Sequence, residues 1–219
     1  MFRLSFRKLI VGFSRFNYSN MSTKSALVLV AEGSEEMECI ISVDVLRRGG
    51  VNVTLAGLKG NEPTKCSRDV VIVPDKSMEE AIKCGPYDAI VLPGGLEGSK
   101  SFAASSTLGD LLKEQEKCGK IVAAICAAPT ALKAHGIGLG KRLTCYPGLE
   151  KELIDSYKYS EDKVVVDGNI ITSRGPGTAF DFGLTLVEQL VGADTSSSVK
   201  KRFTIVICIL IQMCLQLVY

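Results

Sequence analysis

Apolar residues along the middle of the chain alternate between short continuous runs and helically spaced patterns. The run ALVLVA at residues 26–31 predicts a buried strand, and residues 35–50 place their apolar side chains near one face of a helix. Gly49 and Gly50 end that helix, and a second apolar run, NVTLAGL, follows at residues 52–58. These residues predict a β-α-β unit with parallel strands and a right-handed crossover.

The same alternation continues to residue 190. We expect strands at 70–73, 89–92, 121–125 and 142–145, helices at 78–83, within 97–117, from 129, at 149–156 and at 179–190, and a hairpin at 164–172. No internal repeat or long linker interrupts the pattern. The sequence therefore predicts one α/β domain with a doubly wound, mainly parallel sheet over residues 21–194.

The composition of the chain mainly argues against certain classes of ligand. The chain has 219 residues, of which 46% are apolar and 23% charged, as in soluble globular proteins. A net charge of +2 and the lack of a basic patch give no argument for nucleic-acid binding. The eight cysteines are scattered without a CxxC pair beside a single histidine, which predicts free thiols and no zinc site. No phosphate-loop or dinucleotide motif appears, so we expect no metal and no cofactor.

Both ends of the chain differ from its middle. Residues 1–20 carry four basic and no acidic residues, so they are interpreted either as a mitochondrial presequence or as a basic tail, with Met21 as a second start. Within residues 195–219, the apolar run from Phe203 to Tyr219 is either a membrane anchor or a segment that covers the core. We expect a cytoplasmic protein from Met21, with mitochondrion and nucleus as alternatives.

Four loops should meet at one edge of the sheet, because ligands bind beyond the carboxyl ends of strands in such folds. They are EGSEEME at 32–38, PGG at 93–95, the residue after IVAAI, which is Cys126, and SRGPGTAF at 173–180. These segments lie far apart in the sequence. The fold is expected to bring them together.

Cys126 lies where a predicted strand ends and a helix begins. Unsatisfied N–H groups at the start of a helix favour thiolate, and the small neighbours Ala124 and Ala128 suit a nucleophile elbow. A reactive cysteine is therefore favoured over a packing one. Gly94 and Gly95 follow another strand and are either oxyanion donors or a plain turn.

Glu38 lies in the loop after the first strand or in the first turn of the following helix. A surface charge is the usual role of such a glutamate, and it is the role expected of the neighbouring Glu35 and Glu36.

Five segments together resemble the DJ-1 branch of the DJ-1/PfpI superfamily, from about Lys24 to Gly192. They are AEGSEEME, CSRDVVIVPD, GPYDAIVLPGG, AAICAAPTAL and ITSRGPGTAFDF. The resemblance implies a flavodoxin-like α/β sandwich, usually a homodimer, which works without a cofactor. It implies a reactive cysteine at Cys126 and a protonated glutamate at Glu38. In that superfamily the cysteine oxidises to a sulfinate held by the glutamate, and the same pair acts on glyoxal and methylglyoxal.

The resemblance also assigns surrounding residues. Gly94 and Gly95 match the backbone donors, and Ala127 follows the nucleophile as a third donor. Arg68 and Pro176 match residues of the pocket or the dimer side, where Tyr146 is expected as well.

The chain departs from its superfamily where histidines are expected. Ala127 stands where the protease branch has a histidine, and Tyr146 in LTCYPG stands at another family histidine position. A phenol is a poor base near neutral pH, which disfavours a Cys-His dyad, a protease and a glutamine amidotransferase. The only histidine, His135, is expected to be a cap or a dipole partner at a helix C-terminus.

Two functions remain open at this level. The first is a cysteine-dependent enzyme that converts methylglyoxal to lactate, or that removes early glycation adducts from thiols, amines and nucleic acids. The second is a non-enzymatic sensor of oxidative stress, a redox-dependent chaperone that binds client proteins after oxidation of Cys126. The expected partners are small aldehydes or adducts, a second copy of the chain and client proteins, with membrane contact through the C-terminal tail as an alternative.

Overall fold

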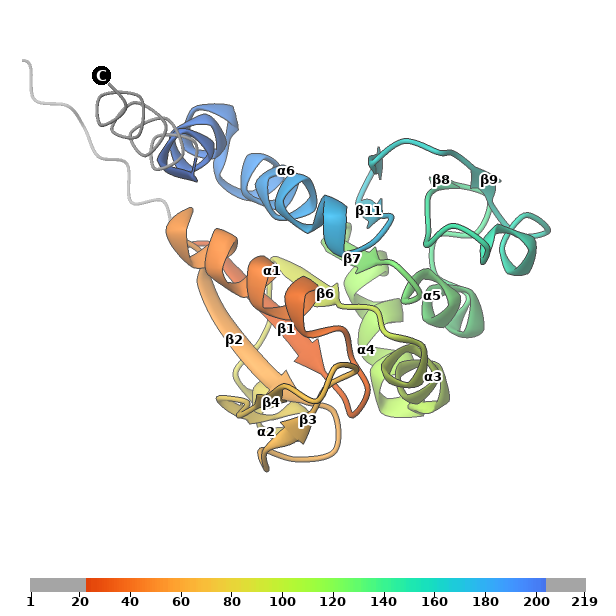
Figure 1. Cartoon of the computed structure of the whole chain (residues 1–219), viewed down its shortest axis with the longest axis horizontal. Helices are drawn as coiled ribbons and strands as arrows, with labels where there is room; N and C mark the ends of the chain where they lie inside the picture. The colour runs from red at the N-terminus through yellow and green to blue at the C-terminus, as the bar shows by residue number, and fades with distance from the viewer. Residues whose placement is uncertain (1–22, 204–219) are drawn as a thin grey trace, which may run out of the picture.

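A mainly parallel sheet forms the centre of the computed structural model, which describes residues 23–203 (Figure 1). Its seven strands lie in the order β10-β11-β7-β6-β1-β2-β5. They are β1 (Ser25–Val30), β2 (Asn52–Gly57), β5 (Lys76–Ser77), β6 (Ala89–Leu92), β7 (Ile121–Ile125), β10 (Val164–Asp167) and β11 (Ile170–Ser173). Only β10 runs antiparallel to its neighbour. The predicted doubly wound α/β fold is confirmed, whereas the expectations for residues 1–20 and for the run after Phe203 lie outside the described residues.

Helices cover both faces of this sheet. One face packs against α1 (Glu36–Arg48) and α6 (Ala179–Val191), the other against α2 (Met78–Lys83), α3 (Leu96–Ala104), α4 (Ser106–Lys117) and α5 (Pro129–His135). Along β1, Ala26 and Val28 join the first core, and Leu27 and Leu29 join the second. Because both faces are buried, the strands are continuous apolar runs instead of alternating ones.

Two predicted strands form outside the main sheet. The run at 70–73 yields β4 (Val71–Ile72), which pairs with β3 (Thr64–Lys65) in a separate antiparallel ribbon, and the edge of the main sheet is the polar strand β5. Val71 and Val73 are exposed, so this apolar run does not mark a core strand. The run at 142–145 yields β8 (Arg142–Leu143), which pairs with β9 (Lys158–Tyr159) in a separate two-stranded sheet.

One helical prediction needs correction. Residues 149–156 form only the 3₁₀ turn η1 (Glu150–Glu152), because Leu153 packs into a small cluster with Leu143, Cys145 and Tyr157 instead of along a helix face. The helical segments expected within 97–117 are confirmed as α3 and α4. They are separated at Ser105, whose hydroxyl accepts a hydrogen bond from Leu108 N and caps α4.

Packing continues beyond the expected domain end at residue 194. Residues 193–203 are helical. Ser196 Oγ donates a 2.8 Å hydrogen bond to Leu184 O, and Val199 is 1% exposed. The ring of Phe203 lies edge-on to that of Phe180 at 5.1 Å and beneath the Arg48 guanidinium. No helix within 23–203 is long and apolar enough to cross a membrane.

The strand order fixes where a ligand site can form. From β1 the chain moves to β2 on one side, and later strands β6, β7 and β11 lie on the other side. The order therefore reverses between β1 and β6, and a crevice opens at the carboxyl ends of these strands. The loops after β1, β6, β7 and β11 all end at this edge.

Candidate active site

Cys126 occupies a sharp turn between β7 and α5. Its backbone has φ 64°, in the left-handed region that non-glycine residues rarely adopt. Two hydrogen bonds hold this turn: Cys126 N donates to Ser173 O at 2.9 Å, and Tyr146 N donates to Cys126 O at 2.8 Å. Cys126 is 8% exposed and lines a pocket, as expected of a nucleophile elbow.

Glu38 lies in the first turn of α1 and is 0% exposed. Its Oε2 accepts a 2.7 Å hydrogen bond from the backbone N–H of Gly94, at the end of β6. Its other carboxyl oxygen, Oε1, is buried and has no hydrogen-bond partner among the described residues. A buried carboxyl with one unsatisfied oxygen is costly when ionised, so it holds its proton more tightly than usual.

The two glycines after β6 have different places in the site. A Cβ on Gly94 would lie 2.6 Å from Cys126 Cβ and 2.8 Å from Glu38 Oε2, so Gly94 fills the space between the thiol and the carboxyl. Gly95 has φ 84°, and its N–H hydrogen-bonds to the Cys126 sulfur, as does the N–H of Ala127. Gly95 and Ala127 therefore stand where oxyanion donors were expected, whereas the Gly94 N–H is already bound to Glu38.

Charge couples Glu38 and Cys126. Burial raises the pKa of Glu38 to about 7, against the lowering effect of the Gly94 hydrogen bond. Burial and then the charge of ionised Glu38 raise the pKa of the Cys126 thiol to about 12. The expectation of a thiol with a lowered pKa is therefore wrong while Glu38 is ionised. Because the charge of one group affects the pKa of the other, the protonation states of Glu38 and Cys126 are coupled.

Glu36 is 6% exposed, which corrects the expectation of a surface charge. It accepts hydrogen bonds from Ser67 Oγ and from Arg68 N, each at 2.9 Å. Burial opposes ionisation, but hydrogen bonds to this carboxylate outweigh it and lower the Glu36 pKa. The carboxylate thus fastens the loop that carries Arg68 to the start of α1. Glu35 is also not a free surface charge, because it caps α1 by accepting from Glu38 N at 2.8 Å.

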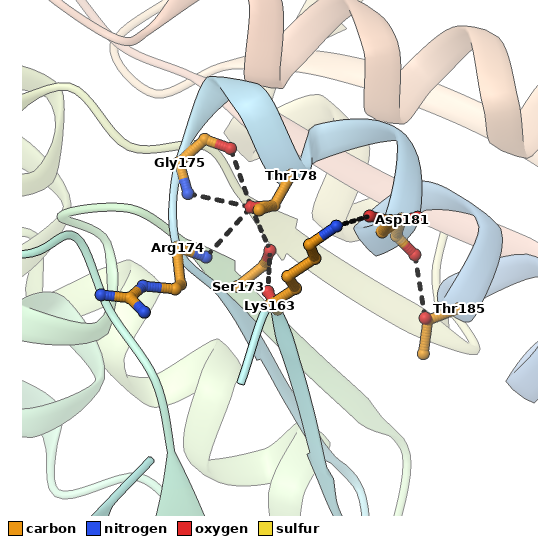
Figure 2. A network of polar contacts seen from close by, with 7 residues as sticks. All are labelled: Lys163, Ser173, Arg174, Gly175, Thr178, Asp181 and Thr185. Atoms are coloured by element: carbon orange, nitrogen blue, oxygen red, sulfur yellow. Dashed lines mark hydrogen bonds and ion pairs between the residues drawn. The ribbon is translucent and has the colours of Figure 1, made fainter. Parts of the chain in front are cut away.

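Thr178 organises the loop after β11, as Figure 2 shows. Its Oγ1 accepts from Arg174 N at 3.2 Å and Gly175 N at 3.1 Å, and lies 2.7 Å from Ser173 Oγ. Ser173 Oγ also donates to Lys163 O at 2.7 Å. Since Ser173 O holds the elbow at Cys126, this network ties the elbow to the pocket wall formed by Gly175 and Pro176.

The pocket beside Cys126 has a volume of about 1130 Å³. It brings together Arg68, Tyr146 and Pro176, the three residues that the sequence assigned to the pocket or dimer side, with Gly95 and Ala127. Glu38 lies behind this surface. The chain brings these residues together from the loops after β1, β6, β7, β8 and β11 and from the ribbon of β3 and β4.

His135 is outside the site. Its Nε2 lies 2.9 Å from Phe102 O, and its ring fills the space above Gly109, so it joins α5 to α3 and α4. The C-cap of α5 is Gly136, in the left-handed conformation. The expected place of His135 at a helix C-terminus is confirmed, since it lies in the last turn of α5, although Gly136 is the cap residue.

Comparison with known proteins gives a consistent result. The sequence pattern of the DJ-1/PfpI family matches residues 24–189. Protein DJ-1alpha of Drosophila melanogaster is 59% identical over 179 residues, which are 81% of this chain and 82% of that protein. The protein named glutathione-independent glyoxalase DJR-1.2 of Caenorhabditis elegans is 44% identical over 81% of this chain and 95% of its own length. The crystal structure of Drosophila melanogaster DJ-1beta superposes with a TM-score of 0.81 at 53% identity, covering 83% and 98% of the two chains.

Proposed function

The chain belongs to the DJ-1/PfpI family, and from this premise we propose that it protects cells by converting methylglyoxal and glyoxal to hydroxy acids without a cofactor. The observation that carries the proposal is the pairing of Cys126, on a strained elbow, with a buried Glu38 whose pKa is about 7. The name of the Caenorhabditis elegans relative supports the same chemistry.

The reaction begins with addition of sulfur to the aldehyde. As the Cys126 sulfur bonds to C1, the thiol proton passes to the Glu38 carboxylate, and the aldehyde oxygen becomes an oxyanion. The N–H groups of Gly95 and Ala127, which already hydrogen-bond to the sulfur, lie beside this oxygen and stabilise its charge. Glu38 then returns the proton to that oxygen, which gives a neutral hemithioacetal.

A proton shift completes the conversion. Glu38 removes the C1 proton, and the electrons move onto the C2 carbonyl oxygen to give an enediolate. The C1 hydroxyl proton passes to the C2 oxygen, the C1 carbonyl forms, and Glu38 delivers its proton to C2, which leaves a thioester at C1 and a hydroxyl at C2. Water hydrolyses the thioester, releasing lactate and the Cys126 thiol. C1 is oxidised from aldehyde to acid while C2 is reduced from ketone to alcohol, so no external oxidant or reductant is needed. A carboxyl that titrates near pH 7 suits both proton transfers.

Removal of early adducts from thiols, amines and nucleic acids follows from the same chemistry, since these adducts release free aldehyde. A second candidate function is a redox sensor in which peroxide oxidises Cys126 to a sulfinate. The unpartnered Glu38 Oε1 favours it, because a protonated carboxyl there can donate to a sulfinate oxygen. Client binding, homodimer formation and cellular location stay predictions.

Lactate production from methylglyoxal by the full chain tests the first function, with Cys126→Ala and Glu38→Gln as variants. We expect both to abolish turnover, and we expect peroxide to stop it while Cys126 gains two oxygen atoms by intact mass. Glu38→Gln should lower turnover more than it lowers sulfinate formation. Lactate formation that persists in Cys126→Ala would refute the enzyme, whereas site-selective sulfinate without turnover would favour the sensor.

A further inference from the structure

The pocket beside Cys126 is much larger than a three-carbon aldehyde. Its volume of about 1130 Å³ slightly exceeds the range of about 300–1,000 Å³ that is typical of pockets for drug-sized ligands. Its charged lining residues are balanced, with Lys59, Lys65 and Arg68 against Glu32, Glu35 and Glu97. Since neither sign of charge dominates, the charge of the walls does not select the substrate. Selection therefore falls to the apolar part of the lining.

Tyr146 belongs to this apolar part and is hydrogen-bonded through its backbone to Cys126. Its backbone N–H donates to Cys126 O at 2.8 Å, which fixes its position relative to the nucleophile. Its ring lies against Gly175, since a Cβ added to Gly175 would be 3.4 Å from Cδ2 of Tyr146. Of the described residues that line the pocket, Tyr146 alone carries an aromatic ring, and it is 48% exposed.

Other apolar side chains extend the surface next to this ring. Pro147, Leu149 and Pro176 line the same pocket with Tyr146, and Met37 and Leu96 line it as well. Met37 and Leu96 are more than half exposed, so a bound apolar group would remove their surface from water. A methyl substituent is too small to cover the tyrosine ring, whereas a planar aromatic substituent can stack against it.

We infer that Tyr146 is a specificity-determining residue and that the pocket prefers α-oxoaldehydes whose ketone carbon carries an aromatic group. The inference rests on the proposed function for its chemistry. With phenylglyoxal the same steps apply: sulfur adds to the aldehyde, the C1 proton moves to C2, and water releases mandelate. One phenylglyoxal and one water give one mandelate, with C1 oxidised and C2 reduced as before.

The first test compares kcat/KM for phenylglyoxal and methylglyoxal in the full chain and in Tyr146→Phe, Tyr146→Leu and Tyr146→Ala. We expect the ratio of the two values to fall about five- to tenfold in Tyr146→Leu and Tyr146→Ala, the scale of one aromatic contact. Tyr146→Phe keeps the ring and should keep the ratio. An unchanged ratio in Tyr146→Leu and Tyr146→Ala would overturn the inference.

A second measurement separates this inference from the proposed function. Benzoylformate and pyruvate have no aldehyde, so they report binding alone through protection of Cys126 against iodoacetamide. We expect benzoylformate to protect more strongly than pyruvate in wild type and Tyr146→Phe, and expect this preference to disappear in Tyr146→Leu. If neither aldehyde is turned over but the preference is seen, the proposed function fails and the aromatic subsite stands. Equal protection by both acids in wild type would reject the subsite.

Discussion

The backbone N–H of Gly94 donates a 2.7 Å hydrogen bond to Glu38 Oε2. This contact joins the end of β6 to the start of α1, on either side of the point where the strand order reverses. It makes Gly94 a support for the carboxyl, while Gly95 and Ala127 remain beside the sulfur. The site is therefore two linked halves, one that holds the proton-carrying group and one that faces the thiol.

Gly94→Ala should disrupt both halves. The added Cβ would approach Cys126 Cβ at 2.6 Å and Glu38 Oε2 at 2.8 Å, and neither neighbour is the end of a flexible surface side chain. We expect a loss of about 1–3 kcal/mol in the free energy of unfolding, typical of overpacking, and loss of lactate formation. Gly60→Ala is the matched control, since its Cβ would meet nothing within 4 Å. Urea unfolding of both variants measures the effect, and equal stability of the two would contradict this packing.

Glu38→Gln should change how stability depends on pH. The folded-state pKa of about 7 lies above the ordinary value of 4.5, so the folded protein holds this proton more tightly than the unfolded chain. The resulting stabilisation is complete below the unfolded pKa and is lost as pH rises through 7. Between about pH 5 and 8 the wild type should lose about 2–3 kcal/mol relative to Glu38→Gln. Urea unfolding of wild type and Glu38→Gln at the two pH values measures this difference. If the free energy of unfolding changes equally with pH in both proteins, the Glu38 pKa is not raised.

Thr178→Val should loosen the loop after β11, whose polar network is drawn in Figure 2. Valine has nearly the same shape but leaves the N–H groups of Arg174 and Gly175 without their acceptor. We expect a destabilisation of about 1–3 kcal/mol and faster alkylation of Cys126, because the loop shields the elbow. Thr178→Ser retains the hydroxyl and should behave like wild type. If Ser and Val variants are alike in both measurements, the hydroxyl network does not hold the wall.

His135→Ala should lower the stability of the fold without changing its catalytic activity. The histidine contacts Phe102 O and fills the space over Gly109, far along α5 from the elbow. Its removal should cost about 1–3 kcal/mol of stability through a lost hydrogen bond and a cavity, without altering kcat/KM for methylglyoxal. Thermal unfolding and lactate assays on the same sample provide the comparison. A large fall in kcat/KM in a variant that still folds would show that His135 takes part in the reaction.

The elements that sequence patterns predicted well are those buried on both sides. The runs at 26–31 and 121–125 have no polar interruption, and their lengths and flanking residues identify them as central parallel strands. Cys126 followed from the same reasoning, because a strand, small neighbours and a proline define an elbow locally. Glu38 needed the resemblance to a family, since a glutamate in the sequence EGSEEME has no local sign of complete burial.

The features that were missed depend on contacts between distant residues. Glu36 accepts from Ser67 and Arg68, which are more than thirty positions away, so its burial has no local sequence signal. Strand β5 is polar and only two residues long, and it is a strand because β2 offers it an edge. Thr178 did carry a signal, a hydroxyl residue directly before a helix. Its role as the centre of the loop network still depends on where β11 ends.

The left-handed backbone at Cys126 sets stability against function. An L-amino acid in this conformation costs about 1–2 kcal/mol, a cost that glycine does not carry. The fold would therefore relax if the nucleophile were replaced by glycine, although the site would lose its sulfur. Laboratory evolution that selects only for heat resistance should therefore favour replacement of Cys126 by glycine. Its retention in such an experiment would require selection for chemistry at the same time.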